Sequence, residues 1–285
     1  MIGKDYLGPD RVLNAIRVQL RHPFTDADRV WVIVEGPTDQ KLFGKLLDGP
    51  QVQVETSHGG VTGVLAIVAA LLPETRRVIG IRDADFLHLE GKEESAEHVF
   101  VTDCHDAEMM SISCDEAYRQ VAREYIGEEK RQRFSREKIL ASLAFIGGLR
   151  WLSHADSLKL NFDGLGLGEH YDAETLILDE TGFLAVILER SKAGRTVSKE
   201  DVEAKIANVS DYRNLCNGHD FQRVFALLAG AGKKKKIGPG DVGGAFRIAY
   251  RPEDFRKTNL YGKLKEWASG QSLPLFSAGM ARETR

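Results

Sequence analysis

Acidic side chains follow three separated apolar segments, each about the length of a β-strand. Glu35 comes directly after residues 29–34, Asp83 and Asp85 lie at the end of residues 77–83, and further acids follow residues 98–103. Carboxylates gathered in one small cleft repel one another unless a cation neutralises them, so this arrangement favours a bound divalent metal. Oxygen ligands select Mg²⁺, Mn²⁺ or Ca²⁺ rather than zinc, and Mg²⁺ is usually shared with a substrate phosphate. The candidate polar residues near these segment ends are Glu35, Asp39, Asp83, Asp85, Asp103, His105, Asp106 and Glu108.

Apolar runs of strand length alternate with helical patterns in the first part of the chain. We expect strands at residues 29–34, 52–56, 77–83 and 98–103, helices at residues 10–21 and 61–72, and a further helix capped by Thr38. This order predicts an α/β fold with a parallel, right-handed sheet flanked by helices. Ligands of such sheets collect outside the carboxyl ends of the strands, so the acids of the three segments are expected to converge there.

The remainder of the chain is expected to be mainly helical. Helices are predicted at residues 115–125, 136–149, 198–209 and 221–228, and residues 158–162 are a strand candidate. Residues 183–188 fit either a strand or a buried helical turn, and residues 231–244 read as a flexible basic loop. The predicted organisation is therefore an N-terminal helix (1–23), a catalytic α/β domain (24–112) and a mainly helical C-terminal region (113–285).

Length and composition indicate an ordinary globular protein. The 285 residues are 42% hydrophobic and 28% charged with a net charge of -3, which excludes collagen-like, coiled-coil and wholly disordered classes. Three cysteines form no CxxC pair, so a disulfide scaffold and a four-thiolate zinc site are disfavoured and a reducing cytoplasm is expected. The apolar run at residues 64–72 is too short to span a bilayer, and we expect no membrane association.

Two of these segments resemble a known family. EGPTD (residues 35–39) after one apolar strand and DAD (residues 83–85) after another are similar to the Toprim domain of topoisomerases, primases and the overcoming-lysogenization-defect nucleases, over residues 28–110. TDCHDAE (residues 102–108) and the distal CNGHD (residues 216–220) resemble more narrowly the Toprim effector subunit of PARIS-type anti-phage defence systems, which is paired with an ABC-type ATPase. The resemblance implies a Toprim-like sheet and a nuclease activity.

The resemblance also implies roles for individual residues. Glu35 would act as general acid or base, and Asp83 and Asp85 would bind Mg²⁺ or Mn²⁺, a division of labour that suits phosphodiester cleavage. Asp39 and Glu108 would complete a second metal site. His105 would contact the scissile phosphate, although a His flanked by acids is often only a surface partner, while Asp103 and Asp106 would support the metal ligands. Each strand-end acid has an alternative structural role as a cap of a helix or turn.

Positive charge gathers elsewhere in the sequence. Residues 223–265 hold 11 Lys and Arg against three acids, whereas residues 83–108 hold nine acids against one Lys. A nuclease needs one region that holds the phosphate backbone and another that cuts it, so a nucleic-acid-binding role is predicted for Lys233, Lys234, Lys235 and Lys236. The alternative is that this run is only a solvated loop.

We therefore expect a cytoplasmic, Mg²⁺-dependent nuclease that acts on RNA or DNA, with tRNA suggested by the resemblance, as a toxic effector of anti-phage defence beside an ABC-type ATPase. The sequence leaves a homodimer open. Two other classes remain: a haloacid-dehalogenase-like phosphohydrolase, with Asp83 as nucleophile and Asp85 as acid, and a non-catalytic adaptor subunit of an ATPase complex. The first places its DxD on the first strand of the sheet, whereas here two strand candidates precede it.

Overall fold

A computed structural model describes residues 8–22, 29–164, 166–191, 196–231 and 236–277. Its contacts divide the chain into two compact units. The first unit comprises Met1–Ala84, Lys92–Ala107 and Arg251–Arg285, and the second comprises Asp85–Gly91 and Glu108–Tyr250. The expected α/β class with a helical C-terminal region is confirmed, while the domain boundaries at residues 23 and 112 stay a prediction.

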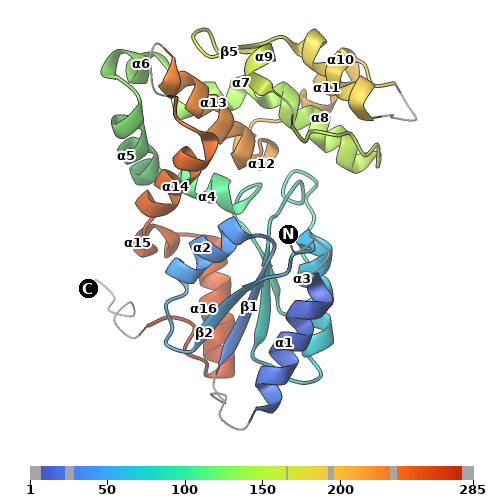
Figure 1. The fold of residues 1–285 in the computed structure, drawn as a ribbon, viewed down its shortest axis with the longest axis vertical. Helices are drawn as coiled ribbons and strands as arrows, with labels where there is room; N and C mark the ends of the chain where they lie inside the picture. Colours follow the sequence, from blue (N-terminus) through green and yellow to red (C-terminus); the bar gives the residue numbers. More distant parts are fainter. Residues whose placement is uncertain (1–7, 23–28, 165, 192–195, 232–235, 278–285) are drawn as a thin grey trace, which may run out of the picture. The chain divides into compact units, whose positions relative to one another are not determined.

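The first unit is built on a four-stranded parallel sheet, seen in the lower part of Figure 1. Its strands are β1 (Val30–Val34), β2 (Val52–Thr56), β3 (Val78–Arg82) and β4 (Val99–Val101), in the order β2-β1-β3-β4. Every residue of β1 is buried, as expected for a central strand covered on both faces. All three strand pairings are parallel, which confirms the sheet type expected from the sequence.

Helices cover both faces of this sheet. Three follow in the order expected from the sequence: α1 (Pro9–Arg21), α2 (Pro37–Leu46) and α3 (Gly60–Leu71). Trp31, Ile33 and Val64 belong to one buried apolar core that joins β1 and α3. Gly80 on β3 allows α3 to approach closely, because a Cβ there would lie only 2.7 Å from a methyl carbon of Val64.

The last part of the chain returns to the first unit. It supplies α15 (Pro252–Phe255) and α16 (Asn259–Gln271), and α16 packs beside β4. Trp267 of α16 makes edge-on ring contacts with His98 and Phe100, at centroid distances of 5.4 and 6.5 Å. The helical C-terminal region of the sequence therefore contributes to the packing of the α/β unit as well as forming helices of its own.

The second unit is mainly helical. Its helices, the first of which begins at Ala107, are α4 (Ala107–Ser113), α5 (Asp115–Tyr125), α6 (Glu128–Arg133), α7 (Arg136–Ser142), α8 (Ala144–Ala155), α9 (Leu167–His170), α10 (Glu180–Ser191), α11 (Lys199–Ile206), α12 (Tyr212–Leu215), α13 (Gly218–Gly230) and α14 (Pro239–Ala249). A two-stranded antiparallel hairpin joins β5 (Tyr171–Asp172) to β6 (Ile177–Leu178). Across the described ranges, no helix is long and apolar enough to cross a membrane.

Three local expectations are corrected in this part of the chain, and one open alternative is settled. Residues 158–162 do not form a strand, and residues 183–188 lie within α10, which settles their ambiguity as helix. The helix expected at residues 136–149 is broken at Leu143 into α7 and α8. The predicted basic loop ends earlier than residue 244, because α14 already begins at Pro239.

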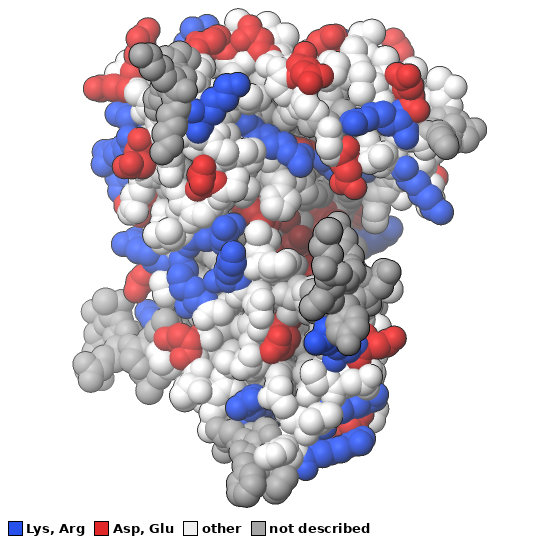
Figure 2. All heavy atoms as spheres, viewed as in Figure 1, with Lys and Arg blue, Asp and Glu red and all other residues white. Residues whose placement is uncertain are grey.

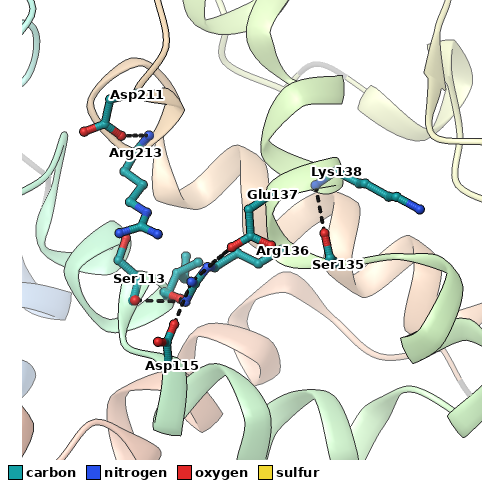
Figure 3. Close-up of polar contacts among 9 residues, drawn as sticks. Ser113, Asp115, Ser135, Arg136, Glu137, Lys138, Asp211 and Arg213 are labelled. Atoms are coloured by element: carbon teal, nitrogen blue, oxygen red, sulfur yellow. Dashed lines mark hydrogen bonds and ion pairs between the residues drawn. The ribbon is translucent and has the colours of Figure 1, made fainter.

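A buried arginine ties three helices of the second unit together (Figure 3). Arg136 of α7 is 6% exposed and donates to the carbonyl of Ser113 at 2.8 Å, at the end of α4. It also binds the Asp115 carboxylate at 2.7 Å, in the first turn of α5. The hydrogen bond and charge of Arg136 hold the pKa of Asp115 below its ordinary value. The Arg136 guanidinium lies 5.4 Å from the ring centre of Tyr118, so one side chain satisfies groups from several elements.

Candidate active site

Glu35 and Asp83 meet at the carboxyl ends of the two central strands. β1 and β3 are paired neighbours, and each of the two acids directly follows its strand. The backbone N–H of Asp83 donates to Oε1 of Glu35 at 2.8 Å. Oδ1 of Asp83 accepts the backbone N–H of Ala107, the first residue of α4, at 3.0 Å. The sequence-based expectation that acids from separate segments converge at this edge of the sheet therefore holds for this pair.

The loop that follows β3 is fixed by further polar contacts. The N–H of Ala84 donates to Oγ1 of Thr102 at 2.9 Å, and this hydroxyl donates to the carbonyl of Cys104 at 2.7 Å. Arg82 and Glu94 form an ion pair at 3.2 Å with side chains only 11% and 13% exposed. These contacts restrict the backbone on both sides of Asp83, so its carboxylate is held by a network that includes β3 and the segment after β4.

A glycine turn lies next to Glu35 on the other side. Gly60, the first residue of α3, has φ of +56°, a left-handed conformation that favours glycine. A Cβ at Gly60 would lie 3.7 Å from Oε2 of Glu35, so the start of α3 is close to this carboxylate.

Asp39 and Asp103 have structural contacts within the first unit. Asp39 is buried, and its Oδ2 accepts the N–H of Gly36 at 2.9 Å. Gly36 caps α2, so the expected cap at Thr38 is wrong, and the residue at the third helical position supplies the carboxylate instead. Asp103 accepts the N–H groups of Asn259 and Leu260 at 2.6 and 2.7 Å, at the start of α16. Both acids therefore stabilise helix N-termini, whatever further role they have.

His105 and Asp106 follow β4 and are both buried, each 3% exposed. The alternative that His105 is a surface partner therefore does not hold. Its predicted contact with a phosphate stays a prediction, as does the supporting role of Asp106.

Asp85 and Glu108 are grouped with the second unit. Asp85 has φ of +49°, a conformation that Asp tolerates better than most residues. Glu108 is buried, and its Oε1 lies 3.8 Å from Nε2 of His219, whose side chain is 51% exposed. Sequence reasoning did not connect Glu108 with His219. The CNGHD string that contains His219 was the available signal, because it lay outside any expected element.

That string also begins α13. The side chain of Asn217 accepts the N–H of His219 at 2.9 Å, so Asn217 caps α13. Asp220 is 4% exposed and binds Arg150 and Arg223, each with a shortest contact of 2.8 Å. Burying one carboxylate between two guanidinium groups satisfies its oxygens and leaves the group of three with an excess positive charge.

The predicted lysine run is described only at its end. Lys233, Lys234 and Lys235 lie outside the described residues. Lys236 is exposed and lines a cavity of about 470 Å³ in the second unit, together with Arg223 and apolar residues that include Leu167 and Leu227. The nucleic-acid-binding role of these lysines stays a prediction.

The pair of Glu35 and Asp83 has the donor chemistry of a magnesium site. Within the residues that the structure describes, no group of three or more His, Cys, Asp or Glu side chains is arranged to hold a metal ion. Mg²⁺ is nevertheless commonly held by one or two carboxylates, with water and substrate phosphate as the other ligands. Glu35 and Asp83 follow adjacent strands, and the backbone N–H of Asp83 contacts the Glu35 carboxylate, so the two acids supply the kind of ligand that such a site needs.

Comparison of the sequence with known protein families and with curated proteins finds no match.

Proposed function

We propose that this protein is a metal-dependent nuclease whose reacting groups lie at the carboxyl ends of β1 and β3. The observation that carries the proposal is the 2.8 Å hydrogen bond from the Asp83 N–H to Glu35 Oε1, because it brings two acids 48 residues apart to one edge of the sheet. Their sequence context, EGPTD and DAD, resembles the Toprim family. Acids at this position suit phosphoryl chemistry better than a packing role, since strand ends are where open α/β sheets bind ligands.

The proposed mechanism gives each acid a separate task. Glu35 moves a proton to or from the reacting oxygen, a task that requires a carboxylate held within hydrogen-bond reach. Asp83, and Asp85 on the same loop, would hold Mg²⁺ or Mn²⁺. Bound there, the metal would stabilise charge on the phosphate and lower the pKa of a water. Asp39 and Glu108 are the proposed ligands of a second metal, and His105 the proposed phosphate contact.

The biological setting is proposed from the resemblance to the PARIS-type effector subunit. It comprises a toxic activity in anti-phage defence, tRNA as the favoured substrate, an ABC-type ATPase as partner, and action in the cytoplasm. The proposal leaves the oligomeric state, including a homodimer, to measurement.

Cleavage by the purified protein tests this function directly. The chain is incubated alone and with the neighbouring ATPase, with labelled tRNA, single-stranded RNA and duplex DNA, in Mg²⁺, Mn²⁺ or EDTA, and all new ends are sequenced. We expect new ends in Mg²⁺ or Mn²⁺ and none in EDTA. Intact substrates in every metal, with and without the ATPase, would contradict the nuclease proposal.

The order of the strands distinguishes the nuclease from one alternative enzyme class. A haloacid-dehalogenase-like phosphohydrolase carries its DxD on the first strand, whereas here Asp83 follows β3 and Glu35 already follows β1. This order favours the nuclease. A phosphoryl group trapped on Asp83 would reverse the ranking, and a double variant Asp83→Ala/Asp85→Ala that retained defence and ATPase binding would favour a non-catalytic adaptor.

A further inference from the structure

Lysine and arginine side chains gather on one surface of the first unit, over α2 and α15. Figure 2 shows this as a group of blue side chains in the region of those helices in Figure 1. The two helices contact each other, and the rings of Phe43 and Phe255 pack edge to face with centroids 6.3 Å apart. We call this the α2–α15 basic surface, and its members are Lys41, Lys45, Arg251, Arg256 and Lys257.

A buried carboxylate, that of Asp254, forms ion pairs with two of these cations. The Asp254 side chain is 3% exposed and binds Arg251 at 3.2 Å and Lys257 at 3.3 Å. The same contacts leave the side chains of Arg251 and Lys257 50% and 76% exposed. Burial lowers the pKa of Lys45, and the charge of Asp254 opposes that shift, so Lys45 belongs to the same group. Asp254 is buried, whereas Lys41, Arg251 and Lys257 are exposed and Lys45 and Arg256 are half-buried. Glu253 of α15 is also exposed and adds one negative charge.

The basic surface and the candidate active site share an element. α2 begins two residues after Glu35, and Lys41 and Lys45 lie about 6 and 12 Å along the helix from its first residue, at 1.5 Å per residue. Lys41 and Lys45 are four positions apart, so they lie on one face of the helix. A nucleic-acid backbone bound to this face would therefore run along α2, whose first turn lies next to Glu35 in the sequence.

We propose that the α2–α15 basic surface binds the phosphate backbone of the nucleic acid on which the candidate active site acts. This inference rests on the proposed nuclease function and names where its substrate is held. Carboxylates at the strand ends repel a polyanion, so a substrate phosphate approaches them only if nearby cations offset that repulsion. The surface supplies several cations within the same unit as Glu35 and Asp83. Lys236, the described residue of the predicted lysine run, is grouped with the other unit.

Binding measured without cleavage tests this surface. The variant Lys41→Gln/Lys257→Gln removes two exposed charges and keeps Arg251 on the buried Asp254. The matched control, Arg21→Gln/Arg76→Gln, removes two charges whose side chains are 77% and 69% exposed, one at the last residue of α1 and one between α3 and β3. Each protein binds a fluorescent single-stranded RNA in EDTA over a range of KCl concentrations, and thermal unfolding verifies that all three fold.

The expected result is a weaker and less salt-dependent complex for the first variant only. Each phosphate contact contributes about 0.7 to the slope of log affinity against log salt for single strands, so two lost contacts reduce the slope by about 1.4. By the same constant, affinity in 0.1 M KCl falls by about 25-fold. Slopes and affinities equal to those of wild type and control would overturn the inference, as would a wild-type chain that binds no RNA at any KCl concentration.

The two proposals fail in different ways. If the basic-surface variant binds RNA normally while wild type cleaves in Mg²⁺, the inference about the surface is wrong and the nuclease function stands. If the variant loses binding as expected while wild type cleaves no substrate in any metal, the surface is supported and the catalytic proposal is wrong.

Discussion

Replacement of Glu35 by glutamine separates its charge from its structural contact. Oε1 of Glu35 accepts the Asp83 N–H at 2.8 Å, and the side-chain carbonyl of glutamine can accept the same bond. The free energy of unfolding should therefore change by less than about 1 kcal/mol, the net value of one ordinary hydrogen bond. Glutamine cannot act as a general acid or base, so the cleavage rate should fall by about 10²- to 10⁴-fold.

The assay compares initial cleavage rates in Mg²⁺ with urea unfolding of the same preparations. Glu55→Gln is the matched control, because the carboxylate of Glu55 on β2 also accepts a hydrogen bond, here from the side-chain amide of Gln53 at 2.8 Å. The control should cleave at the wild-type rate. Glu35→Ala would remove the acceptor as well and should cost about 1–3 kcal/mol of stability. A Glu35→Gln protein that folds normally and cleaves within threefold of wild type would refute the assignment of Glu35.

Three further changes test other parts of the structure. Asp83→Asn should raise the Mg²⁺ concentration for half-maximal cleavage by roughly tenfold or more, with little change in melting temperature; an unchanged metal dependence would remove Asp83 as a ligand. Asp103→Ala should lower the free energy of unfolding in urea by about 1–3 kcal/mol, because two N–H groups of α16 lose their acceptor, and Asp103→Asn should lower it less. Burial raises the pKa of Tyr118 to about 12, whereas in the unfolded chain this hydroxyl ionises near pH 10. The contribution of Tyr118 to the free energy of unfolding should therefore stay constant below pH 10 and fall by up to about 3 kcal/mol between pH 10 and 12. Urea unfolding at pH 9 and 11.5 measures this loss of stability, and Tyr118→Phe should lose less than wild type between the two pH values. An equal loss in both proteins would contradict the assignment of this pH dependence to Tyr118.

The sheet could be predicted from the sequence because its strands are short apolar runs with clear ends. Residues 29–34 and 77–83 were expected as central strands, and β1 and β3 lie within them. The rule that parallel strands end at the same edge then predicted that Glu35 and Asp83 meet. Helix breaks were harder to predict: Leu143 separates α7 from α8 without a Gly or Pro to indicate an end.

Contacts between distant segments could not be predicted in this way. Asp103 accepts N–H groups from Asn259 and Leu260, more than 150 residues later in the chain. No periodicity or motif in a single sequence reports such a pairing. The α2–α15 basic surface has the same origin, because α2 and α15 come together only through the return of the chain to the first unit. The basic segment recognised in the sequence, residues 223–265, includes Arg251, Arg256 and Lys257, but the sequence did not connect them with Lys41 and Lys45.

Helix capping and metal binding compete as explanations of an acid at a strand end, and the hydrogen bonds distinguish them only in part. Asp39 and Asp103 accept N–H groups at helix starts, which explains their positions without any ligand. Asp83 also accepts an N–H from the first residue of α4, so a structural role alone could account for it. Glu35 differs, because its hydrogen bond comes from a loop residue that is itself a candidate ligand. Asparagine at position 83 keeps the carbonyl acceptor and removes the charge. Its effect on metal dependence at unchanged stability therefore decides whether Asp83 does more than hold α4.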